Sequence, residues 1–412
     1  MKTFAIHTLG CKLNYSESSH ISRELQQNGF VLSDNPDYIL VNTCAVTSTA
    51  EKKCRNSISK WHRENPKAKI IVMGCYAALQ AETIAQWEGV CKVFGNVDKI
   101  NVIDFLRGAE MLDFPPYFFS TFSSHDRTRS FLKVQDGCDY HCSYCTVAKA
   151  RGESRSDSIV NVLSNMEQIK KLGLKEVNLT GVNVGDFGRK SGENFTQLVV
   201  ALDKQAAVPR IRISSIEPNL LTQEIIDRVA QSSCFLPHFH IPLQSGCDTI
   251  LKQMHRRYLR SLFAEKVDYI KKKMPYACIA IDVIAGFPSE TDEDFADTCR
   301  FLESLPLSYL HVFTYSRRPG TLAAAMKNQV PDEVKHQRTH RLLEISKQKK
   351  WEFYNQNVGQ VRSVLWEEEC SDGVMYGFTD NYIKLKAPYQ VEMVNTIESV
   401  LITPDNFVLN EG

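Results

Sequence analysis

Three cysteines within one short segment constrain this chain more than any other feature of its sequence. Cys138, Cys142 and Cys145 form the pattern C-x3-C-x2-C, directly after a strand-like run at residues 131–135. Three thiolates at this spacing can bind three irons of one [4Fe–4S] cluster, which leaves the fourth iron open to a small molecule. The alternative is a zinc site with a distant fourth ligand, because short cysteine spacings also serve zinc. The segment therefore predicts a metal centre.

Strand and helix patterns alternate around this segment. Six runs have strand character: residues 131–135, 176–181, 210–216, 238–243, 278–285 and 310–315. Helical patterns separate them, and a long helix is expected to begin near Pro331, a favoured first helical position. Six βα units predict a complete or partial barrel, whose active site is built from the loops after the strands. The cysteine segment falls at that end, which favours a cluster over zinc.

A second parallel sheet is predicted at the start of the chain. Short apolar runs recur there at residues 4–9, 38–42, 70–73 and 93–94. Cys11, Cys44 and Cys75 stand at or just after the ends of three of these runs. Ligands of open α/β sheets bind outside the carboxyl ends of the strands, so three such cysteines can converge on one cluster. The alternative is three buried structural thiols, since free cysteine is often buried.

The chain holds thirteen cysteines in total. No apolar run approaches the ~20 residues that a membrane-spanning helix needs, and the first residues lack the pattern of a secretion signal. A cytoplasmic protein without membrane contact is therefore expected, in which thiols stay reduced and serve metal or redox chemistry. The remaining seven cysteines match no motif and are interpreted as core or incidental: Cys54, Cys91, Cys234, Cys247, Cys278, Cys299 and Cys370.

The last part of the chain has a different pattern of apolar and turn residues. From residue 359 onward short alternating segments are separated by turns such as Asp372–Gly373 and Asp380–Asn381, which predicts a small antiparallel β-barrel. The expected fold class is thus α/β, with an N-terminal Rossmann-like parallel sheet, a central partial (β/α)6 barrel and the small barrel at the end. The expected divisions are an N-terminal domain at 1–112, a linker at 113–130, the central barrel at 131–357 and the terminal module at 358–412.

The central motif resembles the signature of the radical S-adenosylmethionine (SAM) superfamily, C-x3-C-x-aromatic-C, with Tyr144 at the aromatic position. The resemblance implies that SAM chelates the open iron and is cleaved to a 5′-deoxyadenosyl radical. Three later segments resemble the superfamily's cofactor contacts: Thr180-Gly181-Val182-Asn183, Glu217, and the run from Asp282 to Pro288 with Ile284 and Gly286. By that resemblance, Tyr144, Thr180, Gly181, Asn183, Glu217, Ile284 and Gly286 are expected to bind SAM.

The segments around the first three cysteines resemble the methylthiotransferase family within that superfamily. They read Thr8-Leu9-Gly10-Cys11-Lys12-Leu13-Asn14, Val41-Asn42-Thr43-Cys44-Ala45-Val46-Thr47 and Gly74-Cys75-Tyr76-Ala77. The resemblance implies a second [4Fe–4S] cluster on Cys11, Cys44 and Cys75, and a terminal TRAM module that binds RNA. It also implies two uses of SAM, one as methyl donor and one as radical source.

Three segments look most like the branch of this family that modifies tRNA at threonylcarbamoyladenosine. They are the Thr8–Asn14 segment, Arg212-Ile-Ser-Ser-Ile-Glu217-Pro and His240-Ile-Pro-Leu-Gln-Ser-Gly-Cys247-Asp248. The expected target is carbon 2 of that adenosine, at position 37 beside the anticodon. A flavodoxin or ferredoxin is the expected electron donor, and a monomer the expected state.

Charge bears on how RNA is bound. The formal net charge is only +1, so phosphate contacts have to come from local basic runs at 252–275 and 317–350, unless these are solvated helix faces. Arg317 and Arg318 follow the last barrel strand and are predicted to reach the substrate. From residue 359 onward nine acidic residues face three basic ones, which disfavours phosphate binding there and favours packing of the module on the barrel.

Other functions stay open at this level. Within the family, the target could instead be isopentenyladenosine in tRNA or an aspartate of a ribosomal protein, and the acidic terminal module fits a basic protein partner. A more distant alternative is a non-catalytic, metal-stabilised RNA-binding protein. That alternative predicts four protein ligands for each metal and no cofactor pocket, whereas each cysteine set holds three.

Overall fold

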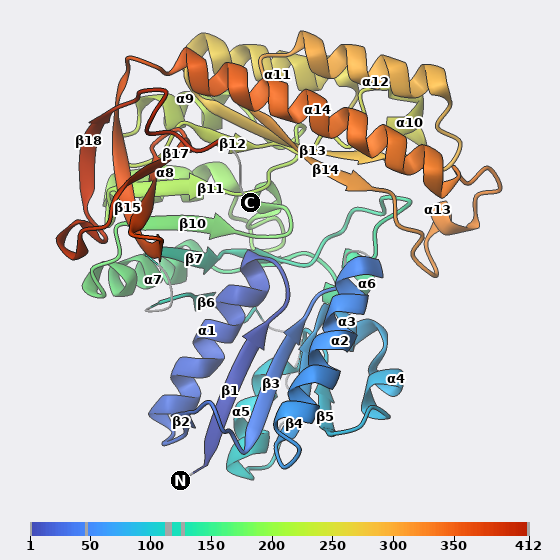
Figure 1. Cartoon of the computed structure of the whole chain (residues 1–412), viewed down its shortest axis with the longest axis vertical. Coiled ribbons are helices and arrows are strands. Elements are labelled where there is room, and N and C mark those ends of the chain that lie inside the picture. The colour runs from blue at the N-terminus through green and yellow to red at the C-terminus, as the bar shows by residue number, and fades with distance from the viewer. Residues whose placement is uncertain (1, 46–47, 112–117, 125–127, 410–412) are drawn as a thin grey trace.

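The computed structural model describes residues 2–45, 48–111, 118–124 and 128–409 (Figure 1). The N-terminal region forms a five-stranded parallel sheet in the order β2-β1-β3-β4-β5. Its strands are β1 (Thr3–Thr8), β2 (Val31–Leu32), β3 (Tyr38–Thr43), β4 (Lys69–Gly74) and β5 (Val90–Phe94). Its helices are α1 (Lys12–Gln27), α2 (Ser48–Glu64), α3 (Cys75–Leu79), α4 (Ala81–Ala85) and α5 (Val102–Arg107).

Alternation along the central strands of this sheet explains why both of its faces are covered. Ile39 and Val41 pack into one core cluster with residues of α2 and α3, whereas Leu40 packs into another with α1 and α5. Successive side chains of a strand point to opposite faces, so a continuous apolar run is what a doubly covered sheet requires. The four predicted strands are confirmed, and only the short β2 lacked a sequence signal.

The central region is an open, curved parallel sheet. The order β11-β10-β7 continues through bridges at Ile211–Phe235 and Ser215–His240 into β12-β13-β14. The strands are β7 (Arg129–Lys133), β10 (Glu176–Thr180), β11 (Arg210–Ile213), β12 (His238–His240), β13 (Cys278–Ala285) and β14 (Tyr309–Thr314). The helices that cover its outer face are α7 (Ile159–Lys171), α8 (Phe195–Gln205), α9 (Gln223–Gln231), α11 (Arg260–Lys273), α12 (Asp292–Ser304) and α14 (Asp332–Gln356). The predicted partial six-stranded barrel is confirmed.

Shorter elements lie in the connections. They are β6 (Thr121–Phe122), β8 (Gln135–Asp136), β9 (Arg155–Ser156), α6 (Val147–Arg151), α10 (Asp248–Gln253) and α13 (Leu322–Ala325). The predicted long helix is α14, with Pro331 just before its first residue. The predicted strand at 238–243 ends early, at His240, because Pro242 has no N–H to donate to a ladder.

The expected linker at 113–130 falls partly outside the described residues. Its described part is packed: β6 pairs antiparallel with β7, and the guanidinium of Arg23 in α1 donates to the carbonyl of Phe122 at 2.8 Å. The N-terminal region is therefore held against the barrel by this segment. No boundary is tested by these contacts, and the expected division of the chain stays a prediction.

The terminal region is a curled antiparallel sheet in the order β17-β16-β15-β18 (Figure 1). Its strands are β15 (Val361–Ser371), β16 (Val374–Thr379), β17 (Lys384–Pro388) and β18 (Ile397–Leu401). Asp372 and Gly373 both have positive φ, so the predicted hairpin turn is confirmed. Among the described residues the curled sheet is a half-barrel, and its apolar face packs on the end of α14 through Phe353 and Tyr354.

The terminal module is also fastened to the barrel by buried charge. Glu176 of β10 accepts hydrogen bonds from Arg210 at 2.8 Å and from Arg212 at 2.7 Å. The two guanidiniums also donate to backbone carbonyls of the module, among them those of Phe378 and Thr379. Burial alone would raise the pKa of Glu176, but the surrounding arginines lower it well below its usual value. Packing on the barrel, the favoured prediction for this module, is confirmed.

Candidate functional site

The short-spaced cysteines lie on the loop between β8 and α6. Each sulfur receives an N–H: Cys138 from the backbone of Tyr140 at 3.3 Å, Cys145 from that of Val147 at 3.4 Å, and Cys142 from Arg256 at 3.2 Å. Burial raises the pKa of Cys138 to about 12 and that of Cys145 to about 11. Iron therefore has to displace protons to bind here, and the N–H donors then stabilise the thiolates.

A cavity of about 280 Å³ opens beside these three sulfurs. Among the expected cofactor residues, Tyr144, Asn183, Glu217 and Ile284 line it, together with all three cysteines. The side-chain nitrogen of Asn183 is buried without a partner among the described residues, as is one carboxylate oxygen of nearby Asp186. A ligand with polar groups would satisfy such atoms, because buried polar groups are almost always hydrogen-bonded. The cavity and its donors therefore fit SAM beside a cluster.

Arg256 is one of two arginines that line this cavity, and no sequence pattern indicated that position. It sits in the basic run at 252–275, but its side chain is only 4% exposed. Its guanidinium pairs with Glu217 and contacts both the sulfur of Cys142 and, at 3.5 Å, the hydroxyl of Tyr144. Burial raises the pKa of Glu217, although Arg256 acts in the opposite direction. This part of the expected RNA-binding run therefore lines the smaller cavity beside the cysteines.

The other expected cofactor residues lie elsewhere. Thr180 and Gly181 line a second, larger cavity, and Gly286 lines neither. A Cβ on Gly181 would come within 2.9 Å of the side-chain oxygen of Gln135, so packing inside the protein already requires the glycine. Gly286 has φ +76° and turns the chain after β13, where its N–H donates to Glu290 at 2.9 Å. Their expected role toward SAM stays a prediction.

The second cysteine set lies at the carboxyl edge of the N-terminal sheet, which faces the barrel (Figure 1). Cys11 caps the start of α1, Cys44 follows β3 and Cys75 begins α3, and β1, β3 and β4 are neighbours in the sheet. Gly74, before Cys75, has φ +100°, and a Cβ there would meet the side-chain oxygen of Asn42 at 2.4 Å. The topology therefore brings three sequence-distant cysteines to one edge, as predicted.

Polar side chains surround this edge. The amide nitrogen of Asn96 donates to the sulfur of Cys75 at 3.4 Å and to the carbonyl of Ala150 at 2.7 Å. The sulfur of Cys11 donates to the side-chain oxygen of Asn14 at 3.7 Å, and Arg151 donates to that same oxygen. Arg151 and Ala150 belong to α6, which follows the other cysteine set directly. One short helix therefore connects the two sets.

A buried network of charges lies beneath this contact. Glu17 of α1 pairs with Lys99 from its own region, and with Lys133 at 3.1 Å and Arg151 at 3.3 Å from the barrel. Burial alone would raise the pKa of Glu17, but these cations lower it to about 2. Asp136 forms ion pairs with the same two barrel cations and with Arg155, so the network carries more cations than carboxylates. A positive surplus suits an edge that has to hold thiolates.

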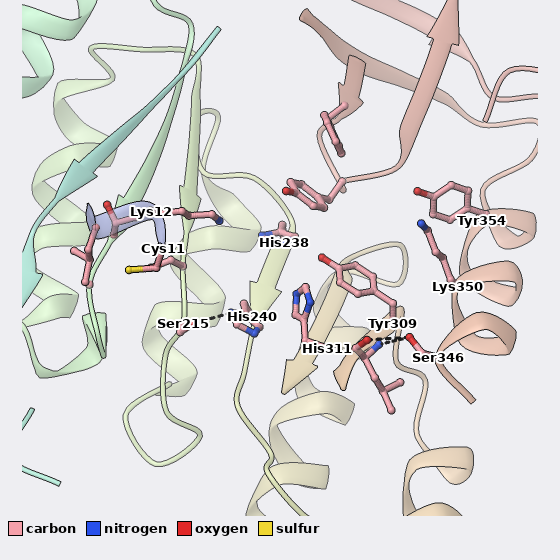
Figure 2. A pocket seen from close by; sticks show the side chains of 17 residues that line it. Cys11, Lys12, Ser215, His238, His240, Tyr309, His311, Ser346, Lys350 and Tyr354 are labelled. Atoms are coloured by element: carbon pink, nitrogen blue, oxygen red, sulfur yellow. Dashed lines mark hydrogen bonds between the residues drawn. The ribbon is translucent and has the colours of Figure 1, made fainter. Parts of the chain in front are cut away.

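The larger cavity has a volume of about 590 Å³ and runs from Cys11 across the open face of the barrel to α14 and the terminal sheet (Figure 2). Ser215 borders both cavities. Its hydroxyl hydrogen-bonds to the Nδ1 of His240 at 2.7 Å, and the Nε2 of His240 lies 2.9 Å from a carboxylate oxygen of Asp282. A Ser–His–Asp chain thus stands where the cavities meet, and no sequence pattern had connected these three residues.

No three His, Cys, Asp or Glu side chains in the described ranges are grouped closely enough to hold a single metal ion. A cluster does not need such a group, because each thiolate binds a different iron. Of the seven cysteines interpreted as core or incidental, five are buried, and Cys91 and Cys370 are exposed. As for membranes, the described residues contain no helix with the length and apolar character to span one.

Arg317 and Arg318 differ in their surroundings. Arg318 lines the smaller cavity and pairs with Glu51 of α2, so it connects the barrel to the N-terminal region. Arg317 is exposed and its Nε donates to the carbonyl of Ala324 at 2.9 Å. Neither contact tests their expected role toward the substrate.

Comparison with known proteins agrees with this arrangement. Residues 3–95 match the family described as "Uncharacterized protein family UPF0004", and residues 132–302 match the radical SAM superfamily. The chain is 36% identical to the threonylcarbamoyladenosine tRNA methylthiotransferase MtaB of Bacillus subtilis, over 100% of this chain and 96% of that protein. It is 35% identical to the tRNA-2-methylthio-N(6)-dimethylallyladenosine synthase of Wolinella succinogenes, over 92% of each.

Among solved structures, the radical SAM methyltransferase TsrM from Kitasatospora setae, with cobalamin and a [4Fe-4S] cluster bound, has a similar fold. The TM-score is 0.58 at 12% identity, and the match covers 91% of this chain and 77% of that one. At this identity the likeness concerns the fold alone.

Proposed function

The chain belongs to the methylthiotransferase family of radical SAM enzymes, and on that premise we propose that it transfers a methylthio group to carbon 2 of N6-threonylcarbamoyladenosine at position 37 of tRNA. The observation that carries the proposal is that Cys138, Cys142 and Cys145 line one cavity and Cys11 lines another, and that the two cavities share Ser215. Relatives named for this activity match the chain at 33–36% identity over nearly its full length.

The residues fit the family's cofactors. Cys138, Cys142 and Cys145 would hold one [4Fe–4S] cluster, and Cys11, Cys44 and Cys75 the other. Tyr144, Asn183, Glu217 and Ile284 would hold SAM in the smaller cavity. When bound, the clusters and SAM supply the electron, the carbon radical and the methylthio group. Such cofactors carry the difficult chemistry, and the protein contributes binding and placement.

The chain's own residues position the substrate and exclude water. The larger cavity begins at Cys11 and ends at the aromatic side chains of the terminal sheet, and it meets the smaller cavity at Ser215, so a base that enters near Ser215 would reach both cavities. An inert C–H bond cannot be activated by acid–base chemistry, so exact placement beside both sets is what the protein has to provide. The His240–Asp282 pair at the junction keeps His240 in a fixed orientation for this task.

A second candidate activity rests on a specific observation. Relatives named as dimethylallyladenosine synthases match this chain at 32–35% identity, close to the values for the threonylcarbamoyladenosine enzymes. The ribosomal-protein branch stays a further alternative because of the acidic terminal module. The smaller cavity, in contrast, argues against a non-catalytic metal-stabilised protein, which needs no cofactor pocket. We further propose that the enzyme acts as a monomer in the cytoplasm, with flavodoxin or ferredoxin as electron donor.

The test is an anaerobic reaction with reconstituted clusters, SAM and a strong reductant. Three substrates are offered separately: tRNA with threonylcarbamoyladenosine, tRNA with isopentenyladenosine, and the ribosomal protein. Mass spectrometry of nucleosides and peptides then detects the methylthio mass. We expect a gain on threonylcarbamoyladenosine only. A gain on either of the other substrates alone would move the assignment to that branch, and 5′-deoxyadenosine without any methylthio product would contradict all three.

A further inference from the structure

The larger cavity is unusual in the charge of its lining. Its lysines are Lys12 and Lys350, and no aspartate or glutamate lines it. Its histidines are His238, His240 and His311, and burial holds the pKa of His238 well below its usual value, so that ring is neutral. These lysines and histidines come from the start of α1, from β12 and β14, and from α14, so all of them face one space from different sides (Figure 2). A cavity lined by one sign of charge concentrates ligands of the opposite sign. This cavity is therefore built for an anion.

The carboxylates nearest to the cavity are already occupied. Asp282 is bound to His240 at 2.9 Å. Glu176 is shared by Arg129, Arg210 and Arg212, all within 4 Å. Both acids are paired with other cations. Burial lowers the pKa of Lys12, and Glu176 in addition raises it by its charge.

Lys12 is the cation with the least support from the protein. It follows Cys11 directly and keeps exposed surface, and in the part of the chain that the structure describes no hydrogen bond or ion pair holds its ammonium. The nitrogen lies 5.8 Å from the ring centre of Phe131, and burial lowers the pKa of Lys12, while the charge of Tyr382 raises it. Figure 2 shows its side chain extended from the cysteine end of the cavity toward His238. An ammonium held this way is available to a ligand.

His238 supplies a second, independent sign of a missing ligand. It is 6% exposed, lines the cavity, and its Nδ1 is buried without a hydrogen-bond partner among the described residues. Buried ring nitrogens are normally paired, so a polar group is expected to complete this site. Its ring lies 4.5 Å from that of Tyr382, whose ring in turn lies 4.8 Å from that of Phe378. These flat side chains form an aromatic wall of the kind on which nucleobases stack.

We propose that Lys12 binds the carboxylate of the threonylcarbamoyl group and thereby selects this nucleoside over one with a neutral N6 substituent. The inference rests on the proposed function. In adenine, carbon 2 and the carbon that bears N6 both flank the same ring nitrogen, N1. A base whose carbon 2 faces the Cys11 end therefore carries its N6 substituent close to the same end, where Lys12 stands. Lys12 also lies within the Thr8–Asn14 segment by which the sequence resembles the threonylcarbamoyladenosine branch.

The test compares two anticodon stem-loop RNAs with the full-length, cluster-loaded enzyme. One carries threonylcarbamoyladenosine, and the other carries its methyl ester, which has the same size but no charge. The wild type is expected to favour the acid in kcat/KM and in affinity measured without reductant. Because a hydrogen bond to a charged group is worth about 10- to 100-fold, Lys12→Met is expected to lower this preference by about that factor. Lys12→Arg should retain most of it.

Controls separate specificity from structure. Lys347→Met removes an exposed lysine of α14 and should leave the preference unchanged. Iron content and 5′-deoxyadenosine release verify that Lys12→Met keeps both clusters. If Lys12→Met loses iron, the comparison is made with Lys12→Gln instead. Equal loss on acid and ester would make Lys12 a structural residue and overturn the proposal. So would a collapse of the preference in Lys350→Met alone, which would place the carboxylate at the α14 end.

Failure of the proposed function looks different. In that case the wild type leaves both RNAs unmodified, and no variant needs to be compared. A wild type that modifies both RNAs equally well would keep the methylthiotransferase activity and overturn the role of Lys12.

Discussion

The two cysteine sets reach neighbouring positions by different routes. Cys138, Cys142 and Cys145 lie on one loop, and two of their three N–H donors come from that loop and from the first residue of α6, which follows it. Cys11, Cys44 and Cys75 come from three connections of a parallel sheet, and Cys75 receives its N–H from the side chain of Asn96, beyond β5. The first set is therefore a local structure, whereas the second depends on the fold of a whole region.

Their electrostatic settings differ as well. Beside the first set, Arg256 is balanced by Glu217, and Arg318, the other arginine of the smaller cavity, is balanced by Glu51. Near the second set, Lys99, Lys133, Arg151 and Arg155 outnumber Glu17 and Asp136, and this network lies between the N-terminal region and the barrel. The comparison teaches that the second set is coupled to an interface. A substitution that weakens this interface should therefore loosen iron binding at the second set and leave the first set intact.

The largest effect should come from the cysteines themselves. Cys138→Ala and Cys11→Ala are both expected to reduce methylthio product below detection. Only Cys138→Ala should also abolish 5′-deoxyadenosine, because only the first set lies beside the SAM cavity. Anaerobic assays of both products by mass spectrometry make the comparison, with Cys370→Ala, at an exposed cysteine, as control. If Cys11→Ala loses 5′-deoxyadenosine formation while the iron of the first set stays bound, the two sets do not differ in their role toward SAM.

Glu17→Gln should have the next largest effect. It leaves Lys99 and Lys133 buried without their carboxylate, which costs about 3–5 kcal/mol of unfolding free energy. Urea denaturation measures the loss, and Glu24→Gln, an exposed position on the same helix, is the matched control. Iron of the second set should become labile while 5′-deoxyadenosine formation persists. Equal effects of the two substitutions would show that the interface network does not support the second set.

The same carboxylate predicts a pH dependence. Burial would raise the pKa of Glu17, but Lys99, Arg151 and Lys133 lower it from 4.5 to about 2 in the folded protein. A depressed pKa contributes stability above about pH 4.5, and that contribution is lost as the pH falls toward 2. Urea midpoints of the wild type should therefore fall more steeply between about pH 5 and pH 3 than those of Glu17→Gln. Parallel slopes would contradict the ion pairing of Glu17.

Arg256→Met tests the setting of the first set. It removes the cation that contacts Cys142 and Glu217, so SAM should bind about 10- to 100-fold more weakly. Equilibrium binding of SAM measures this, with Lys252→Met, at an exposed lysine, as control. The iron of the second set should stay bound. If Arg256→Met binds SAM normally but loses the iron of the second set, Arg256 supports the second set and not the SAM site.

Asn96→Ala should have the smallest effect. It removes one N–H from the sulfur of Cys75 and one from the carbonyl of Ala150, which is worth about 1 kcal/mol. Release of iron to a chelator should be faster, whereas 5′-deoxyadenosine formation should match that of the wild type. If 5′-deoxyadenosine formation changes while iron release does not, Asn96 acts on the first cysteine set and not on the second.

The sequence by itself determined the parts of this protein that depend on neighbouring residues. Cysteine spacing predicted the loop from Cys138 to Cys145, apolar runs predicted the parallel strands to within a few residues, and Asp372–Gly373 predicted its hairpin turn. The sheet-edge rule also placed Cys11, Cys44 and Cys75 together. The first three predictions depend on contacts within a strand, a turn or a connection, where spacing sets the geometry, and the last depends on the common direction of parallel strands.

Only the tertiary structure decided what surrounds these elements. Arg256 looked like one cation in a basic run, and it is buried beside Cys142. Gly181 packs against the side chain of Gln135, a contact that no sequence pattern indicated. Lys12 and His238 are over 200 positions apart, yet they border one cavity. These relations depend on how the barrel, the sheet and the terminal module pack, and local patterns do not encode packing between segments far apart in the chain.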